Sequence, residues 1–259
     1  MTQWTVLGGQ GYVGSRLVDS LRAMGAEVWV PDREDSELWG RDLGHVVYAI
    51  GLTGDFRQRP FDTMEAHVGV LSRVLQRARF ESLTYLSSTR VYMGSTRTDE
   101  DAPLTVQPAD PSDLYNLSKL AGEALCHASG RDGVRVARLS NVVGPSMDPA
   151  SGNFVASLIA EAKSGHIVLR SHPDSRKDYV HIHDVVEWLV LIGERGQHNV
   201  YNVASGRSVS HRQWAEWCAE RFGCNWSALE GTSLQDFHPI EINRLQSEFQ
   251  VRARYAQGW

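Results

Sequence analysis

The sequence predicts an α/β fold with a doubly wound parallel sheet, a shortened sheet edge and a small C-terminal lobe. Through the first half, short β-branched runs alternate with longer amphipathic stretches, which is the pattern of repeated βαβ units. Closely spaced glycines follow the first of these runs. Hydrophobic residues make up 42% and charged residues 22% of the 259 residues, so the chain has ordinary globular composition.

The apolar periodicity predicts where each element lies. In the first half we expect five strands, at Trp4–Gly8, Glu27–Pro31, His45–Ile50, Ser82–Ser87 and Val134–Leu139. We expect three helices between them, at Tyr12–Met24, Asp62–Arg79 and Ser112–Ser129. The second half predicts helices at Asn153–Ser164, Asp184–Glu194 and Ser210–Phe222, and strands at Ile167–Arg170 and Tyr179–Ile182.

Charge, cysteines and hydropathy exclude several classes of protein. The formal net charge is −5 and no long basic run occurs, which argues against a nucleic-acid partner. The three cysteines show no CxxC spacing, which favours a reducing cytosol. The longest apolar run, from Val185 to Gly193, is too short to span a bilayer, and no signal-peptide pattern is present. We therefore expect a cytoplasmic protein without a membrane partner.

Gly8, Gly11 and Gly14 form a GxxGxxG pattern between the first strand and the first helix, which is typical of a dinucleotide-binding turn. Glycine lets the backbone approach a pyrophosphate, and the helix N-terminus supplies free N–H donors. The second strand leads to Asp32, which would accept hydrogen bonds from the adenosine ribose and so favours NAD. The adjacent Arg33 can pair with a 2′-phosphate and leaves NADP open.

This turn assigns residues 1–140 to a Rossmann-type dinucleotide-binding domain, and we expect residues 172–198 to return to it. Residues 141–171 and 199–259 are assigned to a small substrate-binding lobe. Long loops rich in Pro, Gly and Asp at 98–113 and 144–152 are expected to carry binding residues.

Tyr115 and Lys119 lie four residues apart on a predicted helix, so both project from one face. A phenol with a pKa near 10 is a poor base, and a positive charge such as that of Lys119 would lower this pKa. Ser88 follows the end of a strand, where ligands bind in open α/β sheets. The three residues predict proton transfer to or from an alcohol or ketone while hydride passes to or from a nicotinamide.

Five segments together resemble the extended short-chain dehydrogenase/reductase family, and specifically its NAD-dependent epimerase/dehydratase group, which acts on nucleotide sugars. The segments occur in family order, and the resemblance covers the chain from Trp4 to about Ser205. They are GGQGYVG at Gly8–Gly14, LSSTRVY at Leu86–Tyr92, YNLSK at Tyr115–Lys119, RLSNVVGP at Arg138–Pro145 and KDYVHIHDV at Lys177–Val185.

The resemblance implies roles for individual residues. Ser88, Tyr115 and Lys119 would be catalytic. The predicted cofactor-binding residues are Gly8, Gly11, Tyr12, Val13, Gly14, Asp32, Arg33, Gly51, Tyr115 and Lys119. The predicted substrate-binding residues are Ser88, Thr89, Arg90, Asn141, Arg176 and Lys177. Lys177 stands where many family members have an arginine, and the neighbouring Arg176 can substitute for it in binding a pyrophosphate.

Two departures from the family qualify these expectations. Thr89 and Arg90 stand where the dehydratases carry an acidic pair, so no carboxyl is available there to protonate a departing hydroxyl. The segment between Asp32 and His45 is too short for the family's helix and outer strand, which predicts the shortened edge and places Asp42 or Leu43 near the adenine.

These observations favour an NAD-dependent nucleotide-sugar epimerase that oxidises a sugar hydroxyl transiently to a ketone. A nucleotide-sugar ketoreductase with the same three residues is the nearest alternative, and a non-catalytic dinucleotide-sensing protein is an alternative from another class. We expect no metal, because the alternating His181 and His183 lack further residues at ligand spacing. By the same resemblance, helices near 62–79 and 112–129 would pair in a homodimer.

Overall fold

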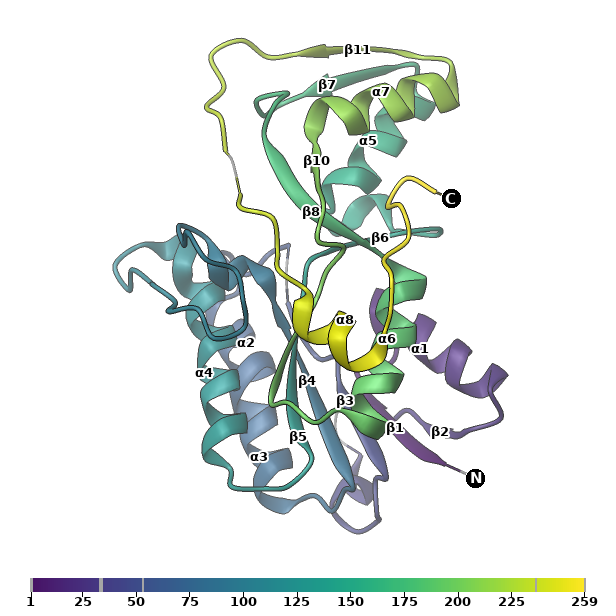
Figure 1. Cartoon of the computed structure of the whole chain (residues 1–259), viewed down its shortest axis with the longest axis vertical. Coiled ribbons are helices and arrows are strands. Elements are labelled where there is room, and N and C mark those ends of the chain that lie inside the picture. Colours follow the sequence, from purple (N-terminus) through teal and green to yellow (C-terminus); the bar gives the residue numbers. More distant parts are fainter. Residues whose placement is uncertain (1, 33–34, 53, 236, 259) are drawn as a thin grey trace.

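The computed structural model describes residues 2–32, 35–52, 54–235 and 237–258. Its centre is a six-stranded sheet in which all neighbouring strands run parallel, and helices cover both faces (Figure 1). In spatial order the strands are β2 (Glu27–Trp29), β1 (Gln3–Leu7), β3 (His45–Tyr48), β4 (Ser82–Ser88), β5 (Val134–Leu139) and β9 (Val200–Val203). The predicted Rossmann-type doubly wound sheet is confirmed.

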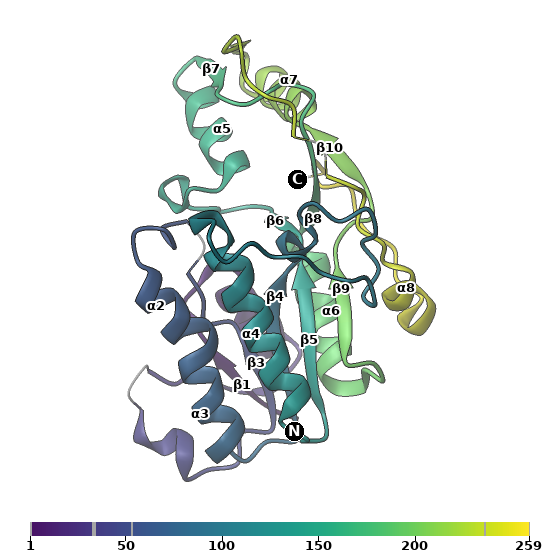
Figure 2. The ribbon, with the colours of Figure 1, turned by 90° about the vertical axis from the view of Figure 1, so that its left-hand side faces the viewer.

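Two apolar cores lie on opposite faces of this sheet, and the helices divide between them (Figure 2). On one face lie α1 (Tyr12–Ala23) and α6 (Ile182–Arg195). On the other lie α2 (Pro60–Met64), a π-helical turn (Glu65–Gly69), α3 (Val70–Arg77) and α4 (Leu114–Ala128). Successive side chains of a strand point to opposite faces, so Val47 enters the first core while Val46 and Tyr48 enter the second. A strand buried on both faces needs a continuous apolar run, which is why the sequence pattern located these strands.

The sheet ends at β2, as the short segment before His45 predicted. Within the described residues, a 3-10 turn at Ser36–Trp39 is the only helix or named strand between β2 and β3. The expectation that Asp42 or Leu43 lies near the adenine is wrong. The Asp42 carbonyl accepts a hydrogen bond from Gln3 Nε2 at 2.8 Å, and Leu43 is fully buried.

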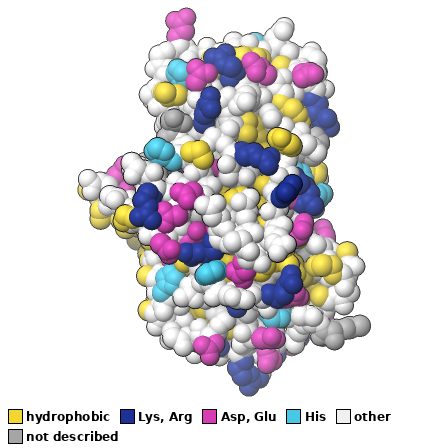
Figure 3. Space-filling view, in the orientation of Figure 1, with side chains coloured by type: hydrophobic (Ala, Val, Ile, Leu, Met, Phe, Trp, Pro, Cys, Tyr) yellow, Lys and Arg dark blue, Asp and Glu magenta, His cyan; other side chains and the backbone are white. Residues whose placement is uncertain are grey.

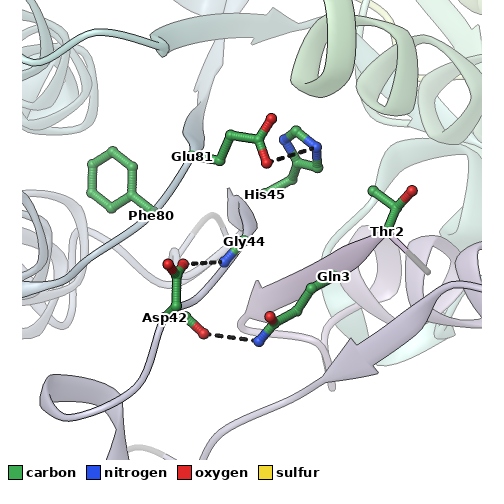
Figure 4. Close-up of a pocket in the computed structure, with 7 residues that line it drawn as sticks. All are labelled: Thr2, Gln3, Asp42, Gly44, His45, Phe80 and Glu81. Atoms are coloured by element: carbon green, nitrogen blue, oxygen red, sulfur yellow. Dashed lines mark hydrogen bonds and ion pairs between the residues drawn. The ribbon is translucent and has the colours of Figure 1, made fainter.

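Gln3 begins β1, so Asp42 lies at the amino edge of the sheet, opposite the glycine-rich turn. A cavity of about 720 Å³ opens at this amino edge between the starts of β1, β3 and β4 (Figure 4). His45 and Glu81 face one another there at 3.7 Å. The cavity is therefore separate from the carboxyl edge, where the candidate site residues lie.

A smaller lobe lies beyond the carboxyl edge of the main sheet (Figure 1). It contains α5 (Phe154–Lys163), α7 (His211–Phe222) and two small sheets. The sheets are formed by the parallel pair β7 (His166–Leu169) and β11 (Asn225–Ala228), and by β10 (Ser208–Ser210), β8 (Arg176–His181) and β6 (Asn141–Val143). Trp214 is fully buried in the core of the lobe, in agreement with a packing role for this tryptophan.

The chain after the lobe does not stay within it. β9 pairs with β5 at the end of the main sheet, although the sequence division assigned residues 199–259 to the lobe. Helix α8 (Asn243–Phe249) packs on β9, and its Leu245 enters the core that α6 covers. Arg254 then forms an ion pair with the buried Asp184 of α6. The C-terminal segment therefore fastens to the main sheet.

The charge distribution on the surface and the length of the helices are relevant to nucleic-acid and membrane partners. Basic and acidic side chains are interspersed over the face shown in Figure 3. None of the helices in the described residues is long and apolar enough to cross a membrane.

Candidate active site

The glycine-rich turn joins β1 to α1 at the carboxyl edge of the sheet. Gly8 has a φ of +84°, and a Cβ there would lie 2.8 Å from the carbonyl carbon of Ala49. A Cβ on Gly14 would lie 2.3 Å from the Gly8 oxygen. Gly11 is the N-cap of α1 and has no side chain to accept from the first-turn amides, which include those of Tyr12 and Val13. The turn therefore presents free N–H donors at a helix N-terminus, as anion binding requires.

Two contacts of this turn were not predicted. Gly9 packs so closely against the segment after β2 that a Cβ would lie 2.7 Å from Val30 Cγ1. The Tyr12 hydroxyl donates to the Pro145 carbonyl at 3.4 Å, which links the turn to the chain that follows β6. Burial raises the pKa of Tyr12 to about 12, against the opposing effect of Arg16.

The other predicted cofactor residues lie on the same edge where the structure describes them. Asp32 follows β2 and is exposed, whereas Arg33 lies outside the described residues. Gly51 follows β3, and a Cβ there would lie 3.1 Å from His67 Nε2 and 3.6 Å from Lys119 Nζ. The ends of β1, β2 and β3 thus place the glycine-rich turn, a carboxylate and the surroundings of Lys119 along one edge.

Ser88 and Tyr115 meet at the end of β4. Ser88 is the last residue of that strand, and Tyr115 lies in the first turn of α4, which packs against β4. The Ser88 side chain lies close enough to the Tyr115 phenol to lower its pKa, and its Oγ accepts the Arg90 N–H at 3.2 Å. Tyr115 is only 6% exposed. A buried phenol therefore lies beside a hydroxyl, as a proton-transfer site requires.

The charge that lowers the pKa of the Tyr115 phenol is not the one that the sequence suggested. Burial raises this pKa, while the Ser88 hydroxyl and the Arg90 guanidinium lower it. Lys119 Nζ lies 5.9 Å from the centroid of the Tyr115 ring and donates to the Leu86 carbonyl at 2.8 Å. The sequence could not show this, because Arg90 reaches Tyr115 only through the fold.

Lys119 is itself perturbed by its surroundings. Burial lowers the pKa of its ammonium to about 7, and the Glu123 carboxylate opposes that shift. Glu123 is held by an ion pair with the buried Arg138 at 2.7 Å. A lysine with a pKa near neutrality can change its charge when a ligand binds beside it.

His67 links the loop after β3 to helix α4 through hydrogen bonds, and the sequence did not predict this role. Its Nε2 accepts the Leu52 N–H at 3.2 Å, so Nδ1 carries the proton and donates to Ser118 Oγ at 2.8 Å. Ser118 in turn donates to the Tyr115 carbonyl at 2.8 Å. Burial and the nearby Lys119 lower the pKa of His67 to about 3, so the ring is neutral. This histidine positions the loop after β3 relative to the helix that carries Tyr115.

The predicted substrate residues divide between the end of β4 and the start of β8. Thr89 and Arg90 are partly buried in the 3-10 turn Thr89–Tyr92 directly after Ser88. Lys177 is also partly buried, and burial and Arg90 both lower its pKa, so these two cations lie near each other. Arg176 is exposed. The Nδ2 of Asn141 donates to the Asp178 carbonyl at 2.8 Å, which leaves its amide oxygen for another partner.

These residues fit a dinucleotide. The Gly8 oxygen lies so close to Gly14 that a Cβ at Gly14 would not fit. The free N–H groups in the first turn of α1 can donate hydrogen bonds to an anion. Asp32 suits a ribose diol, and Gly51 lies next to Lys119. The described residues contain no group of three or more His, Cys, Asp or Glu side chains that could hold a metal ion.

A doubly wound sheet with this turn and a buried serine–tyrosine pair defines a class of dinucleotide-dependent enzymes. Residues 4–204 match the model of the NAD dependent epimerase/dehydratase family, and the chain belongs to this family. The resemblance found in the motifs is thereby confirmed, and NAD is the cofactor of the family.

Known proteins extend this comparison. The UDP-glucuronic acid decarboxylase 1 of Xenopus tropicalis is 24% identical over 251 residues, which cover 84% of this chain but only 60% of that relative. The UDP-glucose 4-epimerase of Thermus thermophilus, solved with NAD, has a TM-score of 0.76 and 22% identity, with 99% of this chain and 96% of that chain covered. RMD from Pseudomonas aeruginosa, complexed with NADPH, has a TM-score of 0.82 and 22% identity, with 99% and 95% covered. At these identities the solved structures establish the fold alone.

Proposed function

We propose that this chain is an NAD-dependent nucleotide-sugar epimerase that transiently oxidises a sugar hydroxyl to a ketone. The observation that carries the proposal is the Ser88 hydroxyl next to the buried Tyr115 phenol, at the same edge of the sheet as the glycine-rich turn of a family that uses NAD. The names of two of the compared proteins, a decarboxylase and an epimerase, specify UDP-sugars, which supports a nucleotide sugar as substrate.

The chain's own residues would bind the cofactor at the carboxyl edge. The amides of the glycine-rich turn would bind the pyrophosphate of the cofactor, and Asp32 would bind its adenosine ribose. Lys119 would bind the portion of the cofactor that lies next to Gly51. NAD, when bound there, supplies a two-electron acceptor and donor for the carbon that carries the reacting hydroxyl. Asp32 disfavours a 2′-phosphate and so favours NAD over NADP.

Tyr115 would move the proton. Ser88 would hold the substrate oxygen beside the phenol, and Tyr115 would remove the hydroxyl proton and return it after the keto intermediate has turned. Burial raises the pKa of Tyr115, and Ser88 and Arg90 oppose that shift. No carboxyl stands at Thr89 or Arg90, so an epimerase is favoured over a dehydratase.

A nucleotide-sugar ketoreductase is the second candidate. It is retained because the chain shares its fold with RMD, which was solved with the reduced cofactor NADPH. The same Tyr115 would then donate a proton to a ketone. Stoichiometry distinguishes the two: an epimerase regenerates its cofactor in each cycle, whereas a reductase consumes one reduced cofactor per product.

The test combines one substitution with one product assay. Tyr115→Phe removes only the phenolic oxygen, so it should leave NAD affinity unchanged and lower turnover by about 10²–10⁴-fold. Turnover would be followed by proton NMR of UDP- and dTDP-sugars incubated with catalytic NAD. Tyr179→Phe is the matched control, because Tyr179 is a buried tyrosine of the lobe whose hydroxyl has no hydrogen-bond partner in the described residues. Full turnover by Tyr115→Phe would remove Tyr115 from the mechanism.

Assembly and compartment stay predictions. We propose a homodimer through the face that carries α3 and α4, near which Phe61 on α2 is 87% exposed. Light scattering of the purified protein would test it, with a mass of one chain, 28.9 kDa, as the contrary result. A cytoplasmic location is proposed on the cysteine pattern alone.

A further inference from the structure

A phenylalanine next to the Tyr115 ring is flanked by two arginines. The Phe56 ring is buried, with its centroid 5.4 Å from that of Tyr115. The guanidinium carbons of Arg57 and Arg90 lie 4.5 Å and 5.8 Å from the same Phe56 centroid. Two cations from separate segments therefore converge on one aromatic ring next to the candidate base.

Neither cation forms an ion pair with another of the described residues. Within the part of the chain that the structure describes, no carboxylate lies within 4 Å of the Arg57 or Arg90 guanidinium, whereas the buried Arg138 is fully paired with Glu123. Arg57 donates to Ser112 Oγ at 3.2 Å, and Arg90 donates to the Ser112 carbonyl at 3.3 Å.

The polar groups nearest to Arg90 leave part of its guanidinium unused. Its Nε is buried and has no hydrogen-bond partner among the described residues. Asp110 and Asp113 raise the pKa of Arg90 at longer range, but they accept hydrogen bonds from the Ser112 and Gln107 amides. Burial and Arg57 lower this pKa, which means that they destabilise the charged guanidinium of Arg90. A bound anion would offset this destabilisation.

The position of Arg90 decides where that anion would belong. Arg90 lies two residues after Ser88 and is close enough to lower the pKa of the Tyr115 phenol. A base must lie within about 3 Å of the proton that it removes, so a group bound by Arg90 lies close to the reacting carbon. The diphosphate of a nucleotide sugar is attached at the anomeric carbon instead, and the exposed Arg176 remains the residue proposed for it, whereas Lys177 lies near Arg90.

We propose that the reacting sugar carries a carboxylate, as in a nucleotide-linked uronic acid, and that Arg90 and Arg57 bind this carboxylate. The inference rests on the proposed function and names its class of substrate. A planar guanidinium matches a carboxylate with two parallel hydrogen bonds, and the buried Nε of Arg90 has no partner among the described residues that a carboxylate would have to displace. Phe56 supplies the apolar wall that shields the pair from water.

The test compares two ligands that differ only in this group. UDP-glucose carries a hydroxymethyl group where UDP-glucuronic acid carries a carboxylate, and the two molecules are otherwise identical. The corresponding pair of dTDP-sugars is measured in parallel. Calorimetry with saturating NAD would use the wild type, Arg90→Gln, Arg90→Lys and, as matched control, Arg22→Gln on the exposed end of α1. Binding rather than turnover is read, so the result does not depend on which carbon reacts.

The wild type should bind the uronic acid at least about tenfold more tightly than the neutral sugar. Arg90→Gln should weaken uronic acid binding by about 10- to 100-fold and neutral-sugar binding by less than about threefold, since an ion pair is lost in the first case only. Arg90→Lys should recover part of the loss, and Arg22→Gln should match the wild type.

Equal affinity of the wild type for both sugars would overturn the inference and leave the proposed epimerase standing. An equal loss of affinity for UDP-glucose, UDP-glucuronic acid and free UDP in Arg90→Gln would also overturn it, because the arginine would then bind the diphosphate. Failure of the folded protein to bind either nucleotide sugar would overturn both the inference and the proposed function.

Discussion

His67 should make the stability of this protein fall on mild acidification. Its Nε2 must stay unprotonated to accept the Leu52 N–H, and the ring lies near the Lys119 ammonium, so protonation breaks a hydrogen bond and adds a like charge. In the unfolded chain an ordinary histidine titrates near pH 6.5. In the folded chain the pKa is about 3. Between these values the unfolded state holds the extra proton, so the free energy of unfolding falls as the pH falls.

The magnitude follows from the difference between the two pKa values. Each pH unit below 6.5 costs about 1.4 kcal/mol until the folded pKa is reached, which gives about 2 kcal/mol at pH 5. His211 adds a loss of the same sign, because burial and Lys177 lower its pKa to about 4. The wild type should thus be distinctly less stable at pH 5 than at pH 7.5.

The assay is urea unfolding, followed by tryptophan fluorescence, at several values between pH 5 and pH 7.5. His67→Gln can still accept the Leu52 N–H through its amide oxygen but cannot titrate, so its loss of stability over this range should be smaller by about 2 kcal/mol. His211→Gln is the matched control for a second buried histidine, and the two effects should add in the double variant. An unchanged pH dependence in His67→Gln would refute the assignment of acid sensitivity to this ring, whatever the absolute stability of the variant.

Three further perturbations test the cofactor site and the core beneath it. Gly14→Ala would place a Cβ 2.3 Å from the Gly8 oxygen, so it should lower NAD affinity at least about tenfold and reduce the melting temperature; a variant with wild-type affinity would contradict the packing argument. Asp32→Ala should shift the ratio of NAD to NADP affinity toward NADP, measured by cofactor titration, and an unchanged ratio would remove Asp32 from the ribose site. Glu123→Ala leaves the buried Arg138 unpaired and should lower the free energy of unfolding in urea by about 3–5 kcal/mol. The double variant Glu123→Met with Arg138→Met should lower it by less, and equal losses in the two variants would show that the ion pair itself matters little.

Much of the main sheet was predictable because each of its first five strands and its flanking helices carries its own signal. β5 begins and ends where the sequence predicted, at Val134 and Leu139, and α1 differs from its expected range by one residue. The strands β6, β9, β10 and β11 have only three or four residues each and were not predicted. Such short runs become strands because neighbours pair with them, a condition that local pattern does not contain.

The candidate site divides in the same way. Ser88, Tyr115 and Lys119 were proposed because their residue types and spacing carry chemical meaning, and the structure brings Ser88 and Tyr115 close together at the end of β4. The distribution of charge around them was not found. The sequence suggested Lys119 as the cation that acts on Tyr115, because it lies one helical turn away, whereas Arg90 is the cation that lowers its pKa in the fold.

The sequence by itself determined the class of fold, the glycine-rich turn and the family, and it proposed three residues for a proton-transfer site, since each depends on neighbours along the chain. Only the tertiary structure decided that Asp42 lies at the amino edge, that β9 joins the main sheet and that Phe56, His67 and Arg90 lie near Tyr115. Charges and hydrogen bonds act over a few ångströms in space, and these partners stand tens of residues apart. The pairing of such segments is set by the packing of the whole sheet, so it is visible only once the chain is folded.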